Sequence, residues 1–292
     1  MPEASQTIEQ ELLRAVADLQ EAGIDTPRLD AGLLMGHVTG LSRTQLITRG
    51  NVELSDAQAR HFRGLVDKRR ERHPLPYLIG KWEFWGMEFE VNPSVLIPRP
   101  ETEVLVETCA EWLRGRPSPI AADIGTGSGA IAVALARELP DAVVYATEIS
   151  EEAARVAARN VQRNGVGDRV KVVVGDLAGP LFDEGLAGHL DALVSNPPYI
   201  SDGAAEAMQP EVRREPKLAT LAGPDALLFY ERILADAPRL LVASGRVLLE
   251  IDPGLSQPIA EIGETHGLKL IEIRRDLAGL ERVAVLECES SS

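Results

Sequence analysis

The hydrophobic positions follow two different patterns along the chain. Up to about residue 73, apolar residues such as Leu12, Val16 and Leu19 recur at the spacing of one helix face. Ser55 precedes another segment of this kind, at the position of a helix N-cap. No strand pattern interrupts this region, so residues 1–73 are predicted to form a small helical bundle.

From residue 74 onward the pattern changes. Apolar and polar residues alternate around Trp85-Gly86, which predicts a β-hairpin within a linker over residues 74–102. Beyond the linker, short apolar strands alternate with helical segments, as in a parallel sheet covered by helices on both faces. Only a short loop joins the last two predicted strands, so these should pair antiparallel. Residues 103–292 are therefore predicted to form an open α/β domain closed by one antiparallel strand.

The composition excludes several classes of protein. No apolar run approaches the ~20 residues that a membrane span needs, so no membrane association is expected. The net charge is −15, the opposite of the balance usual in proteins whose main partner is a nucleic acid backbone. We therefore expect no direct sequence-specific binding of nucleic acid, and a monomer. Cys109 and Cys288 have no metal-ligand spacing around them, so no metal site is expected and a reducing cytoplasm fits. The acidic start of the chain predicts no signal or transit peptide.

One basic run, "DKRRERHP" at residues 67–74, departs from this acidic character. It has two interpretations. The first is the solvated end of a helix, and the second is a local contact surface for an acidic or RNA-bound partner.

The stretch "AADIGTGSGAIAVALA" is typical of a strand, a glycine turn and a helix. Gly125, Gly127 and Gly129 let the backbone turn sharply and approach a ligand without Cβ clashes. The spacing also fits a loose dinucleotide fingerprint, in which a pyrophosphate lies on the helix N-terminus. With Asp123 two residues before the first glycine, it resembles instead the first motif of class I S-adenosylmethionine-dependent methyltransferases. An acidic residue there suits a sulfonium and its amino group.

Two further carboxylates end predicted strands. Glu148 follows Gly129 by 19 residues, where a carboxylate can accept hydrogen bonds from both hydroxyls of a ribose. Asp176 ends the next strand, with Leu177 beside it, in position to accept from an adenine amino group. Open α/β sheets bind ligands at such carboxyl ends of strands. These features fit NAD and S-adenosylmethionine equally.

The tetrapeptide Asn196-Pro197-Pro198-Tyr199 follows the fourth predicted strand. Asn196 is neutral and cannot serve as a general base, but its side-chain oxygen accepts hydrogen bonds. A planar NH₂ group could donate one hydrogen to that oxygen and the other to the Pro197 carbonyl, while Tyr199 packs on its flat face. Bonds in this geometry direct the nitrogen lone pair at a methyl group. The motif therefore predicts a conjugated amino acceptor: an adenine N6, a cytosine N4 or a glutamine amide.

Two sets of site residues follow. The residues expected to bind and orient the acceptor, and so to support catalysis, are Asn196, Pro197, Pro198 and Tyr199. Those expected to bind the cofactor are Gly125, Thr126, Gly127, Ser128, Gly129, Glu148, Asp176, Leu177 and Asn196. Three alternatives from other classes stay open. They are a nucleobase amino-methyltransferase, an NAD-dependent oxidoreductase, in which the tetrapeptide has no role, and a cofactor-binding scaffold without catalysis.

Nearly the whole chain resembles the protein-glutamine N5-methyltransferases that modify class 1 peptide chain release factors (HemK-type proteins). The resemblance rests on "PRLDAGLLMGHV", "IPRPETE", "DIGTGSGAIAVALA" and "VSNPPYI". It implies a class I methyltransferase fold, with a seven-stranded mostly parallel sheet and one antiparallel strand, preceded by the helical bundle and the hairpin linker. It also implies S-adenosylmethionine as methyl donor, S-adenosylhomocysteine as product, and as acceptor the glutamine of the release factor's Gly-Gly-Gln motif. In that family the helical domain and the hairpin help to grip the release factor.

Related enzymes differ at the joint between the domains. Similar enzymes that act on a glutamine of a ribosomal protein differ after the Ile-Pro-Arg stretch, typically with Ser-Pro, whereas this chain has "IPRPETE". Within that joint, Arg99, Glu101 and Glu103 have two interpretations, a linker salt bridge and a substrate contact. The chain also departs from the family pattern, with Glu148 in place of an Asp and alanines at 222 and 226 in place of glycines. The latter leave the shape of the loop at residues 201–224 open.

Overall fold

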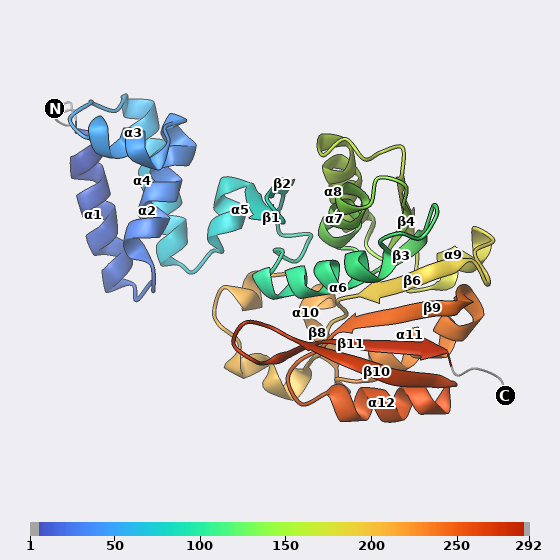
Figure 1. The fold of residues 1–292 in the computed structure, drawn as a ribbon. Coiled ribbons are helices and arrows are strands. Elements are labelled where there is room, and N and C mark those ends of the chain that lie inside the picture. The colour runs from blue at the N-terminus through green and yellow to red at the C-terminus, as the bar shows by residue number, and fades with distance from the viewer. Residues whose placement is uncertain (1–5, 289–292) are drawn as a thin grey trace. The chain divides into compact units, whose positions relative to one another are not determined.

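The computed structural model describes residues 6–288, which form two units (Figure 1). The first, here called the helical unit, contains the chain up to Lys81 together with the short segment Gln209–Arg214. The second, the sheet unit, contains Trp82–Met208 and the chain from Glu215 onward. The polypeptide therefore passes between the units three times, and the segment 209–214 is a separate insertion into the helical unit.

The helical unit is a bundle held by local caps and a small core. Its helices are α1 (Ile8–Glu21), α2 (Pro27–Thr39), α3 (Arg43–Thr48), α4 (Asp56–Arg70) and α5 (Leu75–Ile79). Thr7, Ser42 and Ser55 each form a reciprocal capping box with a glutamine three positions later, which satisfies two backbone donors per helix. The apolar faces enclose a core that includes Met35 and Phe62. The predicted helices and the N-cap at Ser55 are confirmed.

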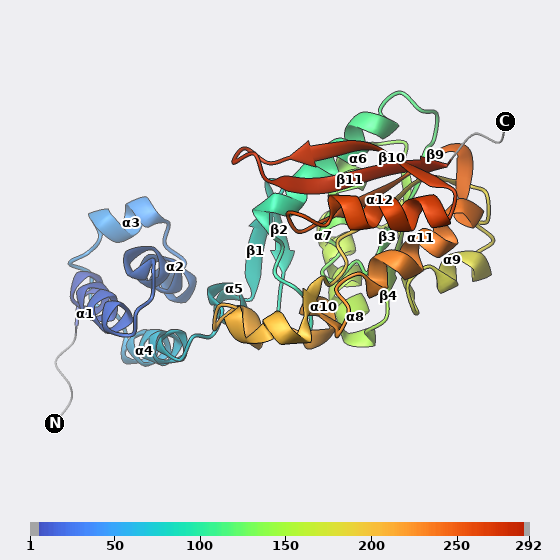
Figure 2. The same ribbon diagram turned by 90° about the horizontal axis from the view of Figure 1, so that it is seen from below.

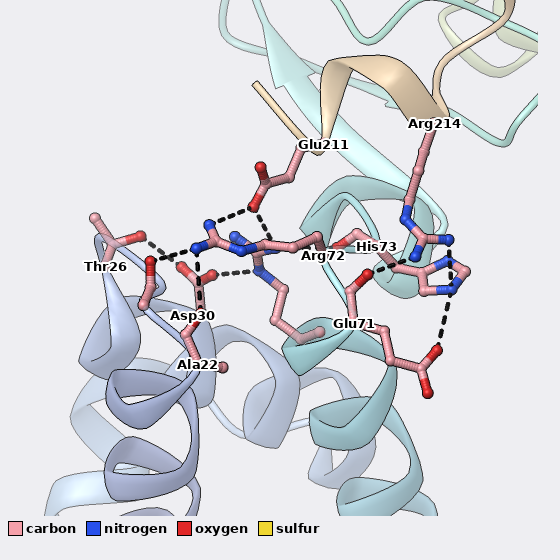
Figure 3. A network of polar contacts seen from close by, with 10 residues as sticks. Ala22, Thr26, Asp30, Glu71, Arg72, His73, Glu211 and Arg214 are labelled. Carbon is pink, nitrogen blue, oxygen red and sulfur yellow. Dashed lines mark hydrogen bonds and ion pairs between the residues drawn. The ribbon is translucent and has the colours of Figure 1, made fainter. Parts of the chain in front are cut away.

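A network of ion pairs connects α4 with the segment 209–214 inside the helical unit (Figure 3). Arg69 is buried and donates from Nε to Asp30 Oδ2 at 2.7 Å and from Nη1 to Glu211 Oε1 at 2.8 Å. Arg72 donates to the same Glu211 oxygen at 3.3 Å and to the carbonyl of Gly23 at 2.6 Å. Glu211 thus lies between two guanidinium groups, and the attraction of Arg69 and Arg72 lowers its pKa against the opposing effect of burial.

The basic run at 67–74 consequently contains two kinds of residue. Lys68 and Arg70 are exposed, as expected for the solvated end of a helix. Arg69 and Arg72 instead pair with carboxylates and carbonyls of their own unit. The interpretation as a solvated helix end is therefore wrong for these two arginines.

The predicted hairpin is confirmed. Strands β1 (Lys81–Phe84) and β2 (Met87–Glu90) are joined by Trp85 and Gly86, whose φ angles are 53° and 66°. Positive φ at both central residues is the requirement of a type I′ turn, whose twist matches that of the flanking strands. Within the sheet unit, the backbone N–H of Trp85 donates to Glu103 Oε1 at 2.9 Å, so Glu103 fixes the hairpin turn.

The sheet unit is built on seven strands in the order β10-β11-β9-β6-β3-β4-β5. Only β11 runs antiparallel to its neighbours β9 and β10, and the other pairs are parallel. The predicted class of fold is thereby confirmed, including the single antiparallel strand. The strands are β3 (Ile120–Ile124), β4 (Val143–Glu148), β5 (Val170–Val174), β6 (Leu190–Ser195), β9 (Leu241–Glu250), β10 (Leu268–Arg275) and β11 (Glu281–Cys288).

Helices cover both faces of this sheet (Figures 1 and 2). The helices are α6 (Glu103–Leu113), α7 (Ala130–Glu138), α8 (Glu151–Arg163), α9 (Gly179–Asp183), α10 (Lys217–Thr220), α11 (Leu228–Leu240) and α12 (Ser256–Thr265). Successive strand residues face opposite sides: Ala121 packs in the core with α6, α7 and α8, and Ala122 in the core with α9, α11 and α12. Both cores are continuous and buried, so the strand ends are held rigidly. Across residues 6–288, no helix combines the length and apolar character needed to cross a bilayer.

The chain after β6 carries its own short elements. Strands β7 (Ile200–Ser201) and β8 (Leu221–Gly223) pair with each other, and the 3₁₀ turns η2 (Asp202–Ala207) and η3 (Val212–Arg214) lie between them in the sequence. The 3₁₀ turn η1 (Pro100–Thr102) precedes α6.

Candidate active site

Strand register brings the predicted site residues to one edge of the sheet. Ile124 of β3 pairs with Thr147 of β4 on one side and with Ser195 of β6 on the other, and Ser195 pairs with Leu249 of β9. The residues that follow this row are Gly125, Glu148, Asn196 and Glu250. The strand order reverses between β3 and β6, and ligands of open α/β sheets bind at the carboxyl end of such a switch point.

The glycine loop joins β3 to α7 through three residues of positive φ. Gly125, Gly127 and Gly129 have φ angles of 72°, 56° and 82°, which other residues adopt only with strain. A Cβ added at Gly125 or Gly127 would meet no atom within 4 Å, so the backbone there borders open space. At Gly129 the added Cβ would lie 3.3 Å from Ala157 of α8, so this glycine also permits close helix packing. The loop therefore combines an open backbone surface with a tight base, which fits a bound cofactor.

Asp123 lies fully buried beneath this loop. Its Oδ2 accepts hydrogen bonds from Thr126 Oγ1 at 2.6 Å and from the backbone N–H of Ala132 at 3.2 Å. Its Oδ1 is buried without a hydrogen-bond partner. Burial raises the pKa of Asp123 to about 7, and the nearby charge of Glu148 contributes in the same direction. Asp123 thus orders the loop through Oδ2, while its Oδ1 stays without a hydrogen-bond partner.

Glu148 holds the same loop from the neighbouring strand. Its Oε2 accepts from the N–H of Gly127 and its Oε1 from the N–H of Ser150, both at 2.9 Å. Each carboxylate oxygen has a second lone pair, so two further donors, such as the hydroxyls of a ribose, can still be accommodated.

Asp176 and Leu177, the two residues predicted at the end of the third strand, are less buried than Asp123 and Glu148. Asp176 is exposed and accepts from Arg232 of α11, with Nη2 and Oδ2 2.6 Å apart. Leu177 is partly buried and has a φ of 45°, an uncommon conformation for a residue with a branched side chain. Arg232 was not singled out from the sequence. It sits where it could orient Asp176 or compete with a ligand for it.

The tetrapeptide at residues 196–199 leaves the end of β6 without regular structure. Asn196 is partly exposed, and its Nδ2 donates to Thr102 Oγ1 at 3.2 Å. Pro197 is buried, and Pro198 and Tyr199 are partly buried. Burial, with smaller contributions from the charges of Glu250 and Asp252, raises the pKa of Tyr199 to about 12. The phenol therefore keeps its proton at physiological pH and cannot act as a base.

Sequence reasoning missed Thr102 and Glu250, which are linked to Asn196 by hydrogen bonds. Glu250 is the last residue of β9 and is 4% exposed, and its Oε2 is buried without a hydrogen-bond partner. Burial raises the pKa of Glu250 to about 7, and hydrogen bonding with the Thr102 side chain opposes that shift. An acidic residue ending the apolar strand "GRVLLEI" was the signal that could have indicated this position.

The joint "IPRPETE" is fixed within the sheet unit by another buried carboxylate. Arg99 forms an ion pair with Glu215, and Glu215 also accepts from the backbone N–H of Ile97 at 3.1 Å. Together with the bond from Trp85 to Glu103, these contacts match the interpretation of the joint as a structural linker. The charge of Glu101 contributes to the raised pKa of Glu250, so Glu101 lies in the electrostatic surroundings of that carboxyl group.

Two family models match the chain. Residues 10–80 match the PrmC N-terminal domain, and residues 100–213 match the methyltransferase small domain. The second match alone spans both the glycine loop and the tetrapeptide.

Proteins of known family show similarity over nearly the full length. The release factor glutamine methyltransferase of Moorella thermoacetica is 43% identical, covering 94% of this chain and 96% of that protein. The enzyme of the same name from Deinococcus radiodurans is 40% identical, covering 93% and 95%. A methyltransferase structure from Pyrococcus furiosus shares the fold, with a TM-score of 0.52 at 23% identity, covering 71% of this chain and 91% of that one. The chain therefore belongs to the release factor glutamine methyltransferase family.

Proposed function

We propose that this protein transfers a methyl group from S-adenosylmethionine to the side-chain nitrogen, N5, of the glutamine in the Gly-Gly-Gln motif of class 1 peptide chain release factors. The observation that carries the proposal is the position of Asn196, one strand away from the glycine loop and in register with it. The names of the relatives at 43% and 40% identity support the same acceptor. A cytoplasmic location and a monomer belong to the proposal.

The cofactor's part is to supply a methyl group on a positively charged sulfur. In the proposal the cofactor binds against the open backbone of the loop at 125–129, and Glu148 accepts hydrogen bonds from the ribose hydroxyls of the cofactor. Asp176 and Leu177 border the adenine. The free Oδ1 of Asp123 favours the cofactor's positive charges through attraction across a poorly solvated region.

On the acceptor side, Asn196 and Pro197 hold the amide and the protein supplies no base. Because the Nδ2 of Asn196 donates to Thr102, its Oδ1 is turned away and can accept one N–H of the glutamine amide. The Pro197 carbonyl accepts the other, and Pro198 and Tyr199 shape the slot. A carbon–nitrogen bond forms, the carbon–sulfur bond breaks, and the nitrogen loses a proton to solvent. Rate enhancement then comes from positioning and fixed dipoles.

The helical unit carries a surface suited to gripping a protein acceptor. An open groove of about 1170 Å³ lies within it, and Leu13, Leu29, Leu33 and Ile47 line the groove with exposed side chains. Gathered apolar side chains of this kind are typical of protein-interaction surfaces. A nucleic acid acceptor would instead call for a basic surface on a chain whose net charge is −15.

Incubation with labelled S-adenosylmethionine and separate acceptors tests the proposal. The acceptors are a class 1 release factor, a ribosomal protein with a methylatable glutamine, and DNA. We expect label on the release factor alone. Transfer to DNA or to the ribosomal protein, with none to the release factor, would overturn the assigned substrate and leave the methyltransferase chemistry in place.

A further inference from the structure

The loop that follows the tetrapeptide is fixed by two glutamates four residues apart. Glu211 lies in the helical unit between Arg69 and Arg72, and Glu215 lies in the sheet unit against Arg99. Both carboxylates are shielded: the Glu211 side chain is 19% exposed and that of Glu215 is 1% exposed. The chain between them therefore has a defined course at each end.

The contacts of the segment 209–214 go beyond a single ion pair. Arg214 donates from Nη2 to the carbonyl of Glu71 at 2.5 Å, and its Nη1 lies 3.1 Å from His73 Nε2 (Figure 3). With the two bonds to Glu211, the end of α4 and the residues after it contact both ends of the segment. Arg69, Arg72, Glu211 and Arg214 are charged, and charge-assisted bonds in partly buried positions are stronger than exposed ones.

The position of this segment in the sequence gives it a functional meaning. It begins ten residues after Tyr199, and the intervening chain contains only β7 and the 3₁₀ turn η2. Strand β7 pairs with β8, which begins six residues after Glu215. The anchored segment is therefore the turning point of the loop that starts at the acceptor slot and returns to it.

We propose that Glu211, held by Arg69 and Arg72, is a positioning residue that fixes the course of the 201–224 loop and thereby the affinity for the protein acceptor. This inference rests on the proposed function for the acceptor's identity. It gives the basic run at 67–74 a role that neither a solvated helix end nor an RNA contact describes.

The test compares Glu211→Gln with Asp202→Asn, which removes an exposed carboxylate from the same loop. Hydrogen–deuterium exchange is measured on the free protein over residues 200–224. Faster exchange is expected in the Glu211 variant and wild-type exchange in the Asp202 variant. Unchanged exchange in Glu211→Gln would overturn the proposal whatever the acceptor is, because this readout needs neither cofactor nor release factor.

Kinetics separate positioning from general damage. In Glu211→Gln the KM for the release factor should rise about fivefold, equivalent to about 1 kcal/mol, with kcat and the Kd for the cofactor unchanged. Arg72→Met should raise KM similarly. The rise in the double variant should be smaller than the two single effects combined, since both changes remove the Arg72–Glu211 contact. Faster loop exchange with an unaltered KM would refute the role in acceptor affinity. If the wild-type protein does not methylate the release factor, the proposed function is refuted, and the exchange experiment still tests the role of Glu211.

Discussion

The cofactor side and the acceptor side of the site each contain a buried carboxyl group at a strand end. Asp123 and Glu250 both have a pKa raised to about 7 by burial, and each keeps one buried oxygen without a partner. Each also interacts with a threonine, Thr126 in one case and Thr102 in the other. The difference is distance along the chain: the first pair is three residues apart and the second is 148.

The first contact is therefore local in sequence, and the second joins distant parts of the chain. The Asp123–Thr126 bond lies within the glycine loop itself, on the side of the site that we propose for the cofactor. The contact of Thr102 with Glu250 forms only when the joint and β9 meet, and Thr102 then receives the Nδ2 of Asn196. Mutations on the cofactor side should therefore change mainly the Kd for the cofactor, and mutations on the acceptor side mainly kcat.

Asn196→Ala should reduce turnover more than any other substitution considered below. It removes the oxygen that accepts from the acceptor amide, and losing one such fixed partner costs about 100-fold or more in kcat. The Kd for S-adenosylhomocysteine, measured by calorimetry, should stay within about twofold of wild type, since the glycine loop is untouched. A large loss of cofactor affinity instead would reassign Asn196 to the cofactor side.

Asp123→Asn should produce the opposite profile. It removes a negative charge beneath the loop and places a buried NH₂ donor where Oδ1 has no partner. We expect the Kd for the cofactor to rise about tenfold, the equivalent of one pKa unit of interaction, and kcat at saturation to change little. The measurement is a cofactor titration at pH 8. An unchanged Kd with reduced kcat would show that Asp123 serves turnover.

Glu250→Gln tests how the buried carboxyl group of Glu250 affects the free energy of unfolding. Since its folded pKa lies above the ordinary value of 4.5, the folded state binds the proton more tightly and wild-type stability falls as pH rises from about 4.5 through 7. The variant carries no such group. Its free energy of unfolding relative to wild type should therefore rise by about 1 kcal/mol between pH 6 and pH 8. Denaturant titrations at both values measure it, and a difference independent of pH would contradict the buried ionisable group.

The smallest expected effect is that of Thr102→Val. The valine keeps the shape but leaves the Nδ2 of Asn196 without its acceptor, so the carboxamide is free to turn and kcat should fall about threefold, as for a bond worth roughly 0.6 kcal/mol. Thr102→Ser, which keeps the hydroxyl, is the matched control and should stay close to wild type. A loss in Thr102→Ser with Thr102→Val close to wild type would instead point to packing of the threonine methyl group.

Local sequence patterns were sufficient to predict the fold and the glycine loop of the site. Alternation around Trp85-Gly86 predicted the hairpin, and the strand–glycine–helix pattern located the loop at Gly125, because each depends on residues that are neighbours in sequence. The single antiparallel strand followed from the shortness of the last loop. Each of these features was confirmed by backbone geometry or register.

Long-range pairs account for what the sequence did not show. Nothing in the run at 67–74 indicates that Arg69 meets Asp30 and Glu211, 39 and 142 residues away. Likewise, nothing in "IPRPETE" distinguishes Thr102 from the charged residues on either side of it as a partner of Asn196. Burial, which raises the pKa of Glu250, depends on the assembled cores and has no periodic signature. Such pairs can be recognised only once the strand order is known.

In the proposed mechanism, Asn196 presents a glutamine amide to the methyl donor. The most direct measurement is fragment mass spectrometry of a class 1 release factor after incubation with S-adenosylmethionine and either the wild-type protein or Asn196→Ala. We predict one added methyl group, on the side-chain nitrogen of the glutamine in Gly-Gly-Gln, with the wild-type protein and almost none with the variant. A methyl group on another residue, or equal methylation by the variant, would contradict the account.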